Sequence, residues 1–368
     1  MINLKRQGLI QDFFITSPSL FDVPDEMAFD VVWLQRPTNS MLVDHLEKRI
    51  GSQYLVDLDD LLIGRPSYVN QRLFNRHVVL DAIRRCKILT VTSLRLAKLI
   101  EKHAGPHIME KVMVCPNGFE FAPQIRQPSR PVAILISSSD TLALSTSKEA
   151  FVRAITKFSI LHSLPVYYFG DPDTFSVDRF SGSLFFGKIG FWHYHALLAS
   201  FPTMIGAAPL ETFADEATLD FINGKSDIKM IDFGGFGHPS VYSNAPPYTD
   251  TDLKAGIIVE NSEKAWLEGL AAVYNDAWQK LDHDQHNVIQ KRNMNRLAAE
   301  CWYEAILKAR LPQAVKGSCL KFPGGTVSSL MNQARHILFS QDHFARRSLE
   351  RRAPSVLKSI ARKFLGES

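Results

Sequence analysis

The sequence is poor in cysteine and contains no long apolar run, and each absence excludes a class of protein. Among its 368 residues only four are cysteines, and no two of them form a Cys-x-x-Cys pair. Neither a disulfide framework nor a cysteine zinc site is therefore indicated. No stretch of about 18 apolar residues is present, and the first residues, MINLKRQGLIQDFF, lack the succession typical of a signal peptide. We therefore expect a globular protein of the cytoplasm.

A strong excess of charge of one sign is also absent. The chain has 42 Lys and Arg residues against 38 Asp and Glu residues, and this net charge of +4 is too small to indicate nucleic acid as a partner. With 45% hydrophobic residues, a chain of this length can bury substantial cores. Its length indicates two domains rather than one.

Short β-rich runs alternate with helical patterns along most of the chain, which is typical of parallel sheets built from βα units. Strands are predicted at 29–35, 54–58, 88–93, 112–116, 132–137, 166–170, 240–243 and 256–260. Between them, apolar residues at helical spacing predict a helix over 148–161. Ser262 is expected to cap a further helix that runs to about residue 276.

The segment CPNGFEFAPQIRQPSRP, residues 115–131, is the clearest boundary between domains. Its Asn-Gly pair marks a turn, and the prolines at 123, 128 and 131 discourage regular structure. We therefore predict an N-terminal Rossmann-like lobe over 1–125, a C-terminal Rossmann-like lobe over 126–311 and a tail over 312–368. Two such lobes are expected to face a cleft, with the ligand site at the carboxyl ends of their strands.

The stretch KSDIKMIDFG, residues 225–234, combines charged and apolar positions at helical spacing. On a helix over this stretch, the side chains of Lys225, Lys229 and Asp232 fall close to one line. The N–H groups at a helix start favour anions, and the Ser226 hydroxyl with two ammonium groups strengthens the preference for a phosphate or diphosphate. The Asp232 carboxylate can then accept both hydroxyls of a ribose. A solvated helix face with an i, i+3 ion pair has the same spacing and is the alternative.

A longer set of residues around this stretch follows the pattern of a known motif. The matching residues are Pro209, Leu210, Phe221, Lys225, Ser226, Lys229, Gly237, Pro239, Ser243, Pro247 and Tyr248. On these residues the segment 208–248 resembles the nucleotide-sugar-binding region of family-4-like glycosyltransferases with the GT-B fold, which act in bacterial surface polysaccharide synthesis. Other parts of the chain are also similar to the family, namely the segments YLVDLDD, VTSLRLAKLI and VMVCPNGFEF and two C-terminal tryptophans. The resemblance therefore covers residues 29–310.

The resemblance implies a metal-independent, retaining glycosyltransferase whose donor substrate is a nucleoside diphosphate sugar and which needs no other cofactor. The implied acceptor is a saccharide or a lipid-linked saccharide of the cell envelope. Lys225 and Lys229 are implied to hold the diphosphate, with Lys225 as a catalytic residue that offsets charge on the leaving group. Ser226, Asp232 and Tyr248 complete the implied donor site.

The chain departs from the family pattern at three positions and in the size of one lobe. Asp232 stands where the family has a glutamate, and Ile222 stands where it has an asparagine. An earlier glutamate of the wider superfamily falls on Gly224. The N-terminal lobe is also abbreviated, because it lacks the Gly-rich first strand, turn and helix of a full lobe.

Two polar segments outside this motif are further candidates. Asp59 and Asp60 follow a predicted strand, where either can orient an acceptor hydroxyl or act as a general base, with helix capping as the alternative. Asp57 and Asp59 form an Asp-x-Asp, the metal signature of GT-A glycosyltransferases, but too few residues precede it for that fold. Ser138 and Ser139 follow another predicted strand and suit a diphosphate, with an ordinary turn as the alternative.

The aromatic run FWHYH, residues 191–195, contains two histidines. Side chains at i and i+2 point to opposite sides of a helix, and no third ligand is evident, so a metal site is not indicated. The run is more similar to the aromatic Tyr that the resembling family carries before its next strand, and a nucleotide base can stack nearby.

The predicted tail is basic. Residues 333–368 carry eight Lys or Arg against three Asp or Glu, and apolar residues from 353 to 364 follow helical spacing. Such a helix can lie on an anionic bilayer, at the inner face of the cell membrane, where a lipid-linked acceptor is found. It can equally dock its apolar stripe on the N-terminal lobe.

Two other functions stay open beside glycosyl transfer. The missing glutamates and the short first lobe also fit a catalytically inactive GT-B relic that binds or scaffolds another transferase. A sugar-nucleotide epimerase or phosphorylase would keep the fold and change the reaction.

Overall fold

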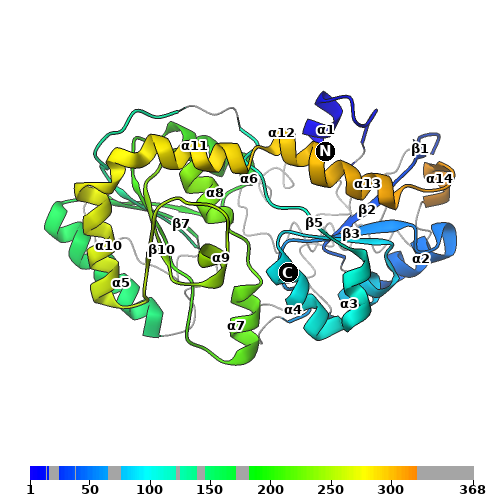
Figure 1. Cartoon of the computed structure of the whole chain (residues 1–368), viewed down its shortest axis with the longest axis horizontal. Helices are drawn as coiled ribbons and strands as arrows, with labels where there is room; N and C mark the ends of the chain where they lie inside the picture. Colours follow the sequence, from blue (N-terminus) through cyan, green and yellow to red (C-terminus); the bar gives the residue numbers. More distant parts are fainter. Residues whose placement is uncertain are drawn as a thin grey trace, which may run out of the picture.

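The structure, a computed structural model, divides into two lobes that lie side by side (Figure 1). It describes residues 1–13, 15, 25–37, 39–64, 76–121, 125–138, 146–170 and 182–320. The N-terminal lobe, in blue and cyan, and the C-terminal lobe, in green and yellow, each contain one main sheet. Among the described helices, none has the length and apolar character that crossing a membrane requires.

The N-terminal lobe is built on a four-stranded sheet in the order β2-β3-β4-β5, and every neighbouring pair in it is parallel. Its strands are β2 Val32–Gln35, β3 Tyr54–Leu58, β4 Ile88–Val91 and β5 Val112–Val114. The helices between them are α2 Ser40–Ile50, α3 Arg76–Arg85 and α4 Leu94–Ala104. Their apolar faces form one core with the sheet, and the central strands β3 and β4 are buried at every position.

Short polar side chains determine where two of these helices begin. The Asn39 side chain accepts a hydrogen bond from the backbone N–H of Met41 at 3.0 Å, and the Ser93 hydroxyl accepts one from Leu96 at 3.1 Å. Such caps satisfy N–H groups that a helix start leaves without partners. Helix α4 therefore begins soon after β4 ends, which places Arg95 in its first turn, within reach of the C-terminal lobe.

The C-terminal lobe contains a six-stranded parallel sheet in the order β11-β10-β9-β6-β7-β8. Its strands are β6 Ile134–Ser138, β7 Val166–Gly170, β8 Leu184–Gly187, β9 Ile205–Ala208, β10 Ser240–Ser243 and β11 Ile257–Val259. Its helices are α5 Thr146–His162, α6 Phe191–Ser200, α7 Glu216–Asn223, α8 Ile228–Gly235, α9 Pro246–Thr249, α10 Glu263–Asn275 and α11 Leu281–Lys291.

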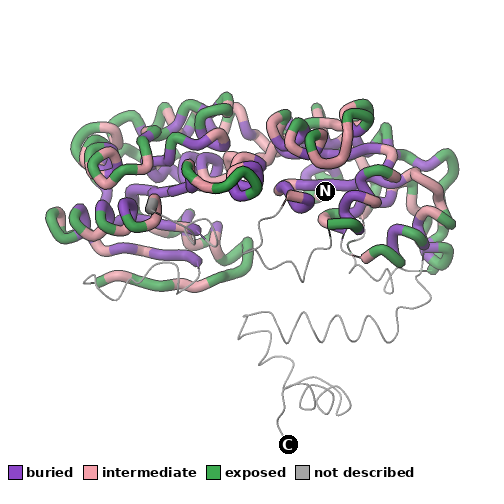
Figure 2. Tube along the Cα trace, turned by 90° about the horizontal axis from the view of Figure 1, so that it is seen from below, coloured by how far each residue is buried: buried purple, intermediate pink, exposed green. Residues whose placement is uncertain are grey.

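Both faces of this second sheet are covered by helices. Helices α5 and α10 pack on one face, where Phe151 and Trp266 meet edge to face with ring centres 4.8 Å apart. Helices α6, α8 and α11 pack on the other face. Figure 2 shows long buried stretches, in purple, inside both lobes. The helices run against the strands, so their N-termini lie at the carboxyl edge of the sheet.

After α11 the chain returns to the N-terminal lobe through α12 Met294–Leu297, a π-helical turn Ala298–Trp302 and α13 Tyr303–Ala309 (Figure 1). This crossing segment packs on the face of the first sheet that α2, α3 and α4 leave open. Trp302 stacks on Trp33 with ring centres 5.1 Å apart. The remaining elements are α1 Ile2–Arg6, β1 Ala28–Phe29, β12 Val315–Lys316, α14 Gly317–Leu320 and the 3-10 helices Pro106–Lys111 and Ala277–Lys280.

Two connections join the lobes, and they pair with each other. The Phe119 N–H donates to the Arg292 carbonyl at 2.6 Å, and the Met294 N–H donates to the Phe119 carbonyl at 3.3 Å. A parallel bridge between Phe119 and Asn293 results. The lobes are therefore linked by a short hinge of two paired segments rather than by one flexible linker.

The parallel α/β architecture predicted from the alternation is confirmed. Strands predicted at 54–58, 166–170 and 240–243 have those bounds in the structure. Ser262 caps α10 as predicted, because its hydroxyl accepts a hydrogen bond from the Ala265 N–H at 3.1 Å. The tail prediction falls almost entirely outside the described residues, which end at 320.

Strands β8 and β9 were not predicted. The sequence of β9, IGAA, has small residues with little strand preference, although it lies in the middle of the sheet. Packing explains the small residues of β9, because a Cβ at Gly206 would collide with the Ser240 hydroxyl and the Phe233 ring. Close approach of neighbouring elements therefore selects residues that do not look like a strand.

Candidate functional site

The segment that carries most of the predicted site residues begins its helix later than expected. Helix α8 starts at Ile228, so Lys225 and Ser226 precede it. The reason lies in the other lobe, because Arg95 donates hydrogen bonds to the backbone carbonyls of Asn223 and, at 2.9 Å, of Lys225. The guanidinium engages the Lys225 carbonyl in place of a helical N–H group. The prediction of one helix over 225–234 is therefore wrong at its start.

Lys229, in the first turn of α8, lies in a polar cluster at the carboxyl edge of the second sheet. Its ammonium donates to the Ser137 hydroxyl at 2.9 Å and to the Tyr194 hydroxyl at 3.1 Å, and it lies 3.5 Å from Asp232 Oδ2. The side chain is 24% exposed. Burial acts to lower the pKa of Lys229, but Tyr194 and Asp232 raise it overall, so the ammonium stays charged.

Asp232 is buried, and both of its carboxylate oxygens have partners. Oδ2 faces Lys229, and Oδ1 lies 3.0 Å from His195 Nε2. The other ring nitrogen of His195, Nδ1, lies 2.8 Å from the Phe191 carbonyl. Both ring nitrogens of His195 thus face oxygen atoms, which fixes the orientation of the imidazole. The cluster of Lys229, Asp232 and His195 therefore joins α6 to α8.

Ser226 and the first residues of α8 offer hydrogen-bond donors. Asn117 donates to the Ser226 hydroxyl oxygen at 2.9 Å, which leaves the hydroxyl proton of Ser226 for another acceptor. Within the described ranges, no carbonyl or side chain accepts a hydrogen bond from the backbone N–H groups of residues 226–229. Lys225 is half buried, with its ammonium 4.6 Å from the centre of the Phe221 ring. Free N–H groups beside ammonium groups form an arrangement that binds anions.

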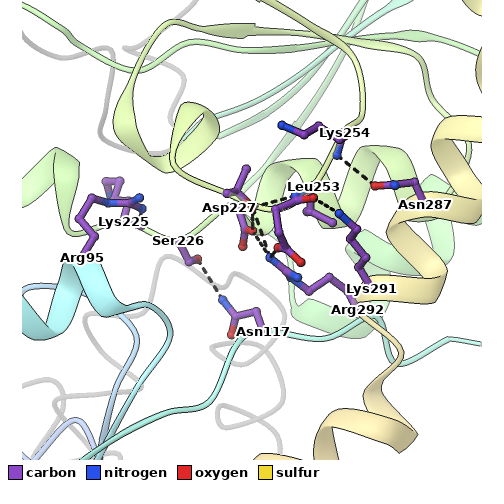
Figure 3. Close-up of polar contacts among 12 residues, drawn as sticks. Arg95, Asn117, Lys225, Ser226, Asp227, Leu253, Lys254, Asn287, Lys291 and Arg292 are labelled. Carbon is purple, nitrogen blue, oxygen red and sulfur yellow. Dashed lines mark hydrogen bonds and ion pairs between the residues drawn. The ribbon is translucent and has the colours of Figure 1, made fainter.

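Asp227 anchors the end of this segment to the hinge, as Figure 3 shows. Its Oδ2 accepts hydrogen bonds from Arg292 at 2.8 Å and from the Thr251 hydroxyl at 2.6 Å. Arg292 also pairs with Asp252 Oδ1 at 2.5 Å. Because the Arg292 backbone belongs to the hinge of two paired segments, the start of α8 is held directly at the junction of the lobes.

The other predicted donor-site residues have different surroundings. Tyr248 is buried in α9, with its ring centre 4.9 Å from that of another core tyrosine. Ser138 is the last residue of β6, and it is buried. Ser139 lies outside the described residues. Ser137, which directly precedes these two serines, is the serine of this run whose hydroxyl contacts Lys229.

Asp59 and Asp60 lie beyond the end of β3 in the N-terminal lobe, and both face Arg36. Arg36 Nε donates to Asp59 Oδ1 at 2.7 Å, and its Nη2 lies 3.5 Å from Asp60 Oδ2. The nearby Asp57 is buried and accepts a hydrogen bond from the Thr90 hydroxyl at 2.7 Å. Burial raises the pKa of Asp57 to about 7, so this carboxyl is able to exchange a proton near neutral pH.

Gly224 faces the N-terminal lobe. A Cβ at this position would lie 2.8 Å from the Cβ of Leu61. The place where the resembling superfamily carries a glutamate is thus filled by an apolar side chain from the other lobe. Contact between the lobes therefore requires a residue without a side chain at 224.

Several partners of the predicted residues were missed by the sequence interpretation. The run FWHYH drew attention as an aromatic segment, but nothing in it indicated that Tyr194 and His195 would contact Lys229 and Asp232 on α8. Arg95 carried no signal at all, because it lies in an ordinary amphipathic helix pattern.

No protein-family model and no curated protein sequence matches the chain. Solved structures do match, and they have the GT-B fold of glycosyltransferases. HepE of Anabaena, solved in complex with UDP and glucose, matches with a TM-score of 0.50 and 15% identity over 74% of this chain and 77% of HepE. A glycosyltransferase from Rickettsia africae matches with a TM-score of 0.47 and 16% identity over 72% of this chain and 74% of its own.

TarM of S. aureus matches 72% of this chain with a TM-score of 0.44 and 11% identity. The present chain spans 57% of the length of TarM. The likeness to HepE confirms the predicted fold of two Rossmann-like lobes of the GT-B type. At such identities a structural likeness establishes the fold alone, so the activity has to be argued from the residues of the site.

Proposed function

We propose that the protein transfers a sugar from a nucleoside diphosphate sugar to the hydroxyl of a saccharide or of a lipid-linked saccharide. One observation carries this proposal. The Lys229 ammonium, the Ser226 hydroxyl and the N–H groups of residues 226–229, which have no acceptor among the described residues, lie at the carboxyl edge of the second sheet, beside the junction of the lobes. In open α/β sheets this edge is where ligands bind, and these groups suit a diphosphate.

The proposed chemistry breaks the bond between the anomeric carbon and the diphosphate oxygen, and forms a bond from that carbon to the acceptor oxygen. The nucleoside diphosphate leaves with the electron pair, and one of its phosphate oxygens takes the proton that the acceptor hydroxyl loses. Lys225 and Lys229 stabilise the negative charge that develops on the leaving diphosphate, which is the main electrostatic demand of the reaction. We propose that this stabilisation replaces a metal ion and that the configuration of the sugar is retained.

The remaining predicted residues have proposed roles on either side of the diphosphate. Ser138, at the end of β6, and Tyr248, in α9, are proposed to act on the donor side, and Ser139, which lies outside the described residues, is proposed to act with Ser138. Asp59 and Asp60, ion-paired to Arg36, are proposed to orient the acceptor hydroxyl from the N-terminal lobe. The ribose role of Asp232 requires that its contacts with His195 and Lys229 rearrange when the donor binds.

The proposed setting is synthesis of a cell-envelope polysaccharide at the cytoplasmic face of the membrane. The basic tail, which the structure does not describe, would hold the protein on anionic lipid near a lipid-linked acceptor. The full-length chain should then sediment with anionic vesicles and not with zwitterionic ones. Equal sedimentation with both would contradict the membrane part of the proposal.

The surroundings of Asp232 and Gly224 favour a second candidate function. Asp232 has both oxygens engaged, and Leu61 fills the space at Gly224. A GT-B relic that binds a nucleotide without transferring a sugar, and that supports another transferase, would tolerate both features.

Titration with UDP, GDP, dTDP and CMP, followed by thermal unfolding, tests the donor class, because a ligand that binds only the native state raises its unfolding temperature. A nucleotide that raises the unfolding temperature is then supplied as a nucleotide sugar with a labelled sugar group, together with candidate acceptors. Transfer to an acceptor supports the transferase, and binding without hydrolysis or transfer supports the relic. No stabilisation by any nucleoside diphosphate would contradict both.

A further inference from the structure

We propose that Arg95 is a positioning residue that sets the path of residues 223–226 from the opposite lobe, so that donor binding depends on contact between the lobes. This inference rests on the proposed function, because it concerns the same diphosphate site. It adds a requirement that the donor-binding lobe alone does not meet. Arg95 belongs to α4 of the N-terminal lobe, and nothing in its sequence surroundings suggests a role at the donor site.

Arg95 donates three hydrogen bonds to backbone carbonyls of the C-terminal lobe. Its Nη1 donates to the Pro246 carbonyl at 2.8 Å, its Nη2 to the Lys225 carbonyl at 2.9 Å and its Nε to the Asn223 carbonyl at 2.5 Å. The side chain is 16% exposed, and the nearest carboxylate that pairs with it, Asp250, is 4.0 Å away. Burial lowers the pKa of Arg95 from a value so high that the guanidinium remains charged.

The geometry of the peptide bond converts these contacts into control of the anion site. In a planar trans peptide the carbonyl of one residue and the N–H of the next point in opposite directions. A guanidinium that holds the Lys225 carbonyl therefore turns the Ser226 N–H away from Arg95. The positive charge on the carbonyl side also polarises the peptide and makes that N–H a stronger donor. Arg95 thus sets the direction of the first donor of the segment and increases its strength.

The contact area around Arg95 supports a firm junction. Lys102, farther along α4, pairs with Glu216 and Asp220 of α7 at 2.6 Å. Leu61 fills the space beside Gly224. These contacts bring α4 against the segment from α7 to α8, so that the fork of Arg95 reaches three carbonyls: those at the end of α7, just after it and at the start of α9. A lysine has one compact ammonium and cannot span this set.

The chain offers a matched control in Arg126. This arginine is also partly buried, burial also lowers its pKa, and it also donates to three backbone carbonyls, those of Phe201, Leu198 and Ala199. Its contacts lie within the C-terminal lobe, at the C-terminal end of α6, and none involves residues 223–226. Removal of Arg126 therefore measures the cost of losing a buried arginine without disturbing the anion segment.

The experiment compares full-length wild type, Arg95→Gln, Arg95→Lys and Arg126→Gln. Calorimetric titration with UDP and with inorganic pyrophosphate gives the dissociation constants, and thermal unfolding without ligand gives the stability of each variant. We expect both Arg95 variants to bind at least tenfold more weakly than wild type, and Arg126→Gln to bind within twofold of wild type. Wild-type affinity in either Arg95 variant, or an equal loss in Arg126→Gln, would overturn the positioning role.

Hydrogen exchange of backbone amides, measured without ligand, keeps the test independent of the proposed function. We expect the amides of residues 224–229 to exchange at least tenfold faster in Arg95→Gln than in wild type or Arg126→Gln. If wild type binds neither UDP nor pyrophosphate, the proposed function fails and the exchange rates alone decide the role of Arg95. Equal exchange in all variants, or failure of both Arg95 variants to fold, would show a merely structural residue.

Discussion

Replacement of Lys229 by methionine is the most direct test of the proposed donor site. The substitution keeps the length of the side chain and removes an ammonium that contacts Ser137, Tyr194 and Asp232. A hydrogen bond to a charged group contributes about 1.5–3 kcal/mol, so the loss of one such bond to a diphosphate corresponds to roughly a 10- to 100-fold weaker dissociation constant. Because His195 still pairs with Asp232, we expect the unfolding free energy to fall by only about 1–3 kcal/mol.

The assay is calorimetric titration with the nucleoside diphosphate that stabilises wild type best, together with denaturant unfolding of both proteins. Lys264→Met is the matched control, because it makes the same charge change on α10 at a side chain that is 85% exposed. The control should bind like wild type. Unchanged affinity in Lys229→Met, or the same loss in the control, would refute the assignment of Lys229 to the diphosphate.

Three further predictions concern the framework around the site. The folded-state pKa of Asp57, about 7, lies above its ordinary value of 3.8, so ionisation of this carboxyl lowers the stability of the protein as pH rises between these values. Asp57→Asn should therefore raise the unfolding temperature relative to wild type at pH 8 but not at pH 4. Equal shifts of the unfolding temperature at the two pH values would contradict this. Gly224→Ala should destabilise the protein because its Cβ would lie 2.8 Å from the Cβ of Leu61, and Leu61→Gly, which removes that atom, should reduce the loss in denaturant unfolding; additive losses in the double variant would exclude the contact. Ser262→Ala should cost about 1 kcal/mol in denaturant unfolding by removing the cap of α10, and no measurable loss would contradict the capping role.

Local patterns predicted the parts of the fold that local physics determines. The strands of residues 54–58 and 166–170 are apolar runs between turn signals, and their bounds agree with the structure. Strand β9, with its small residues, depends on what packs against it, so propensity does not reveal it. The GT-B fold itself was predicted from a resemblance that spans many short segments rather than from any one of them.

The candidate site was predicted in its residues more than in its contacts. Lys225, Ser226, Lys229 and Asp232 were selected by spacing on one helix, but that helix starts at Ile228. The start depends on an arginine more than 120 positions earlier in the chain, which no local pattern contains. The pairing of Asp232 with a histidine 37 residues away is likewise set by the packing of α6 on α8. Side chains that meet through tertiary structure leave no periodic signal.

The paired connections at Phe119 and Asn293 have a mechanical consequence. Because the two crossing segments are hydrogen-bonded to each other, they restrict relative motion of the lobes to rotation about the hinge and oppose sliding and twisting. A single protease cut in either crossing should therefore leave the halves associated, whereas a chain with one tether would come apart.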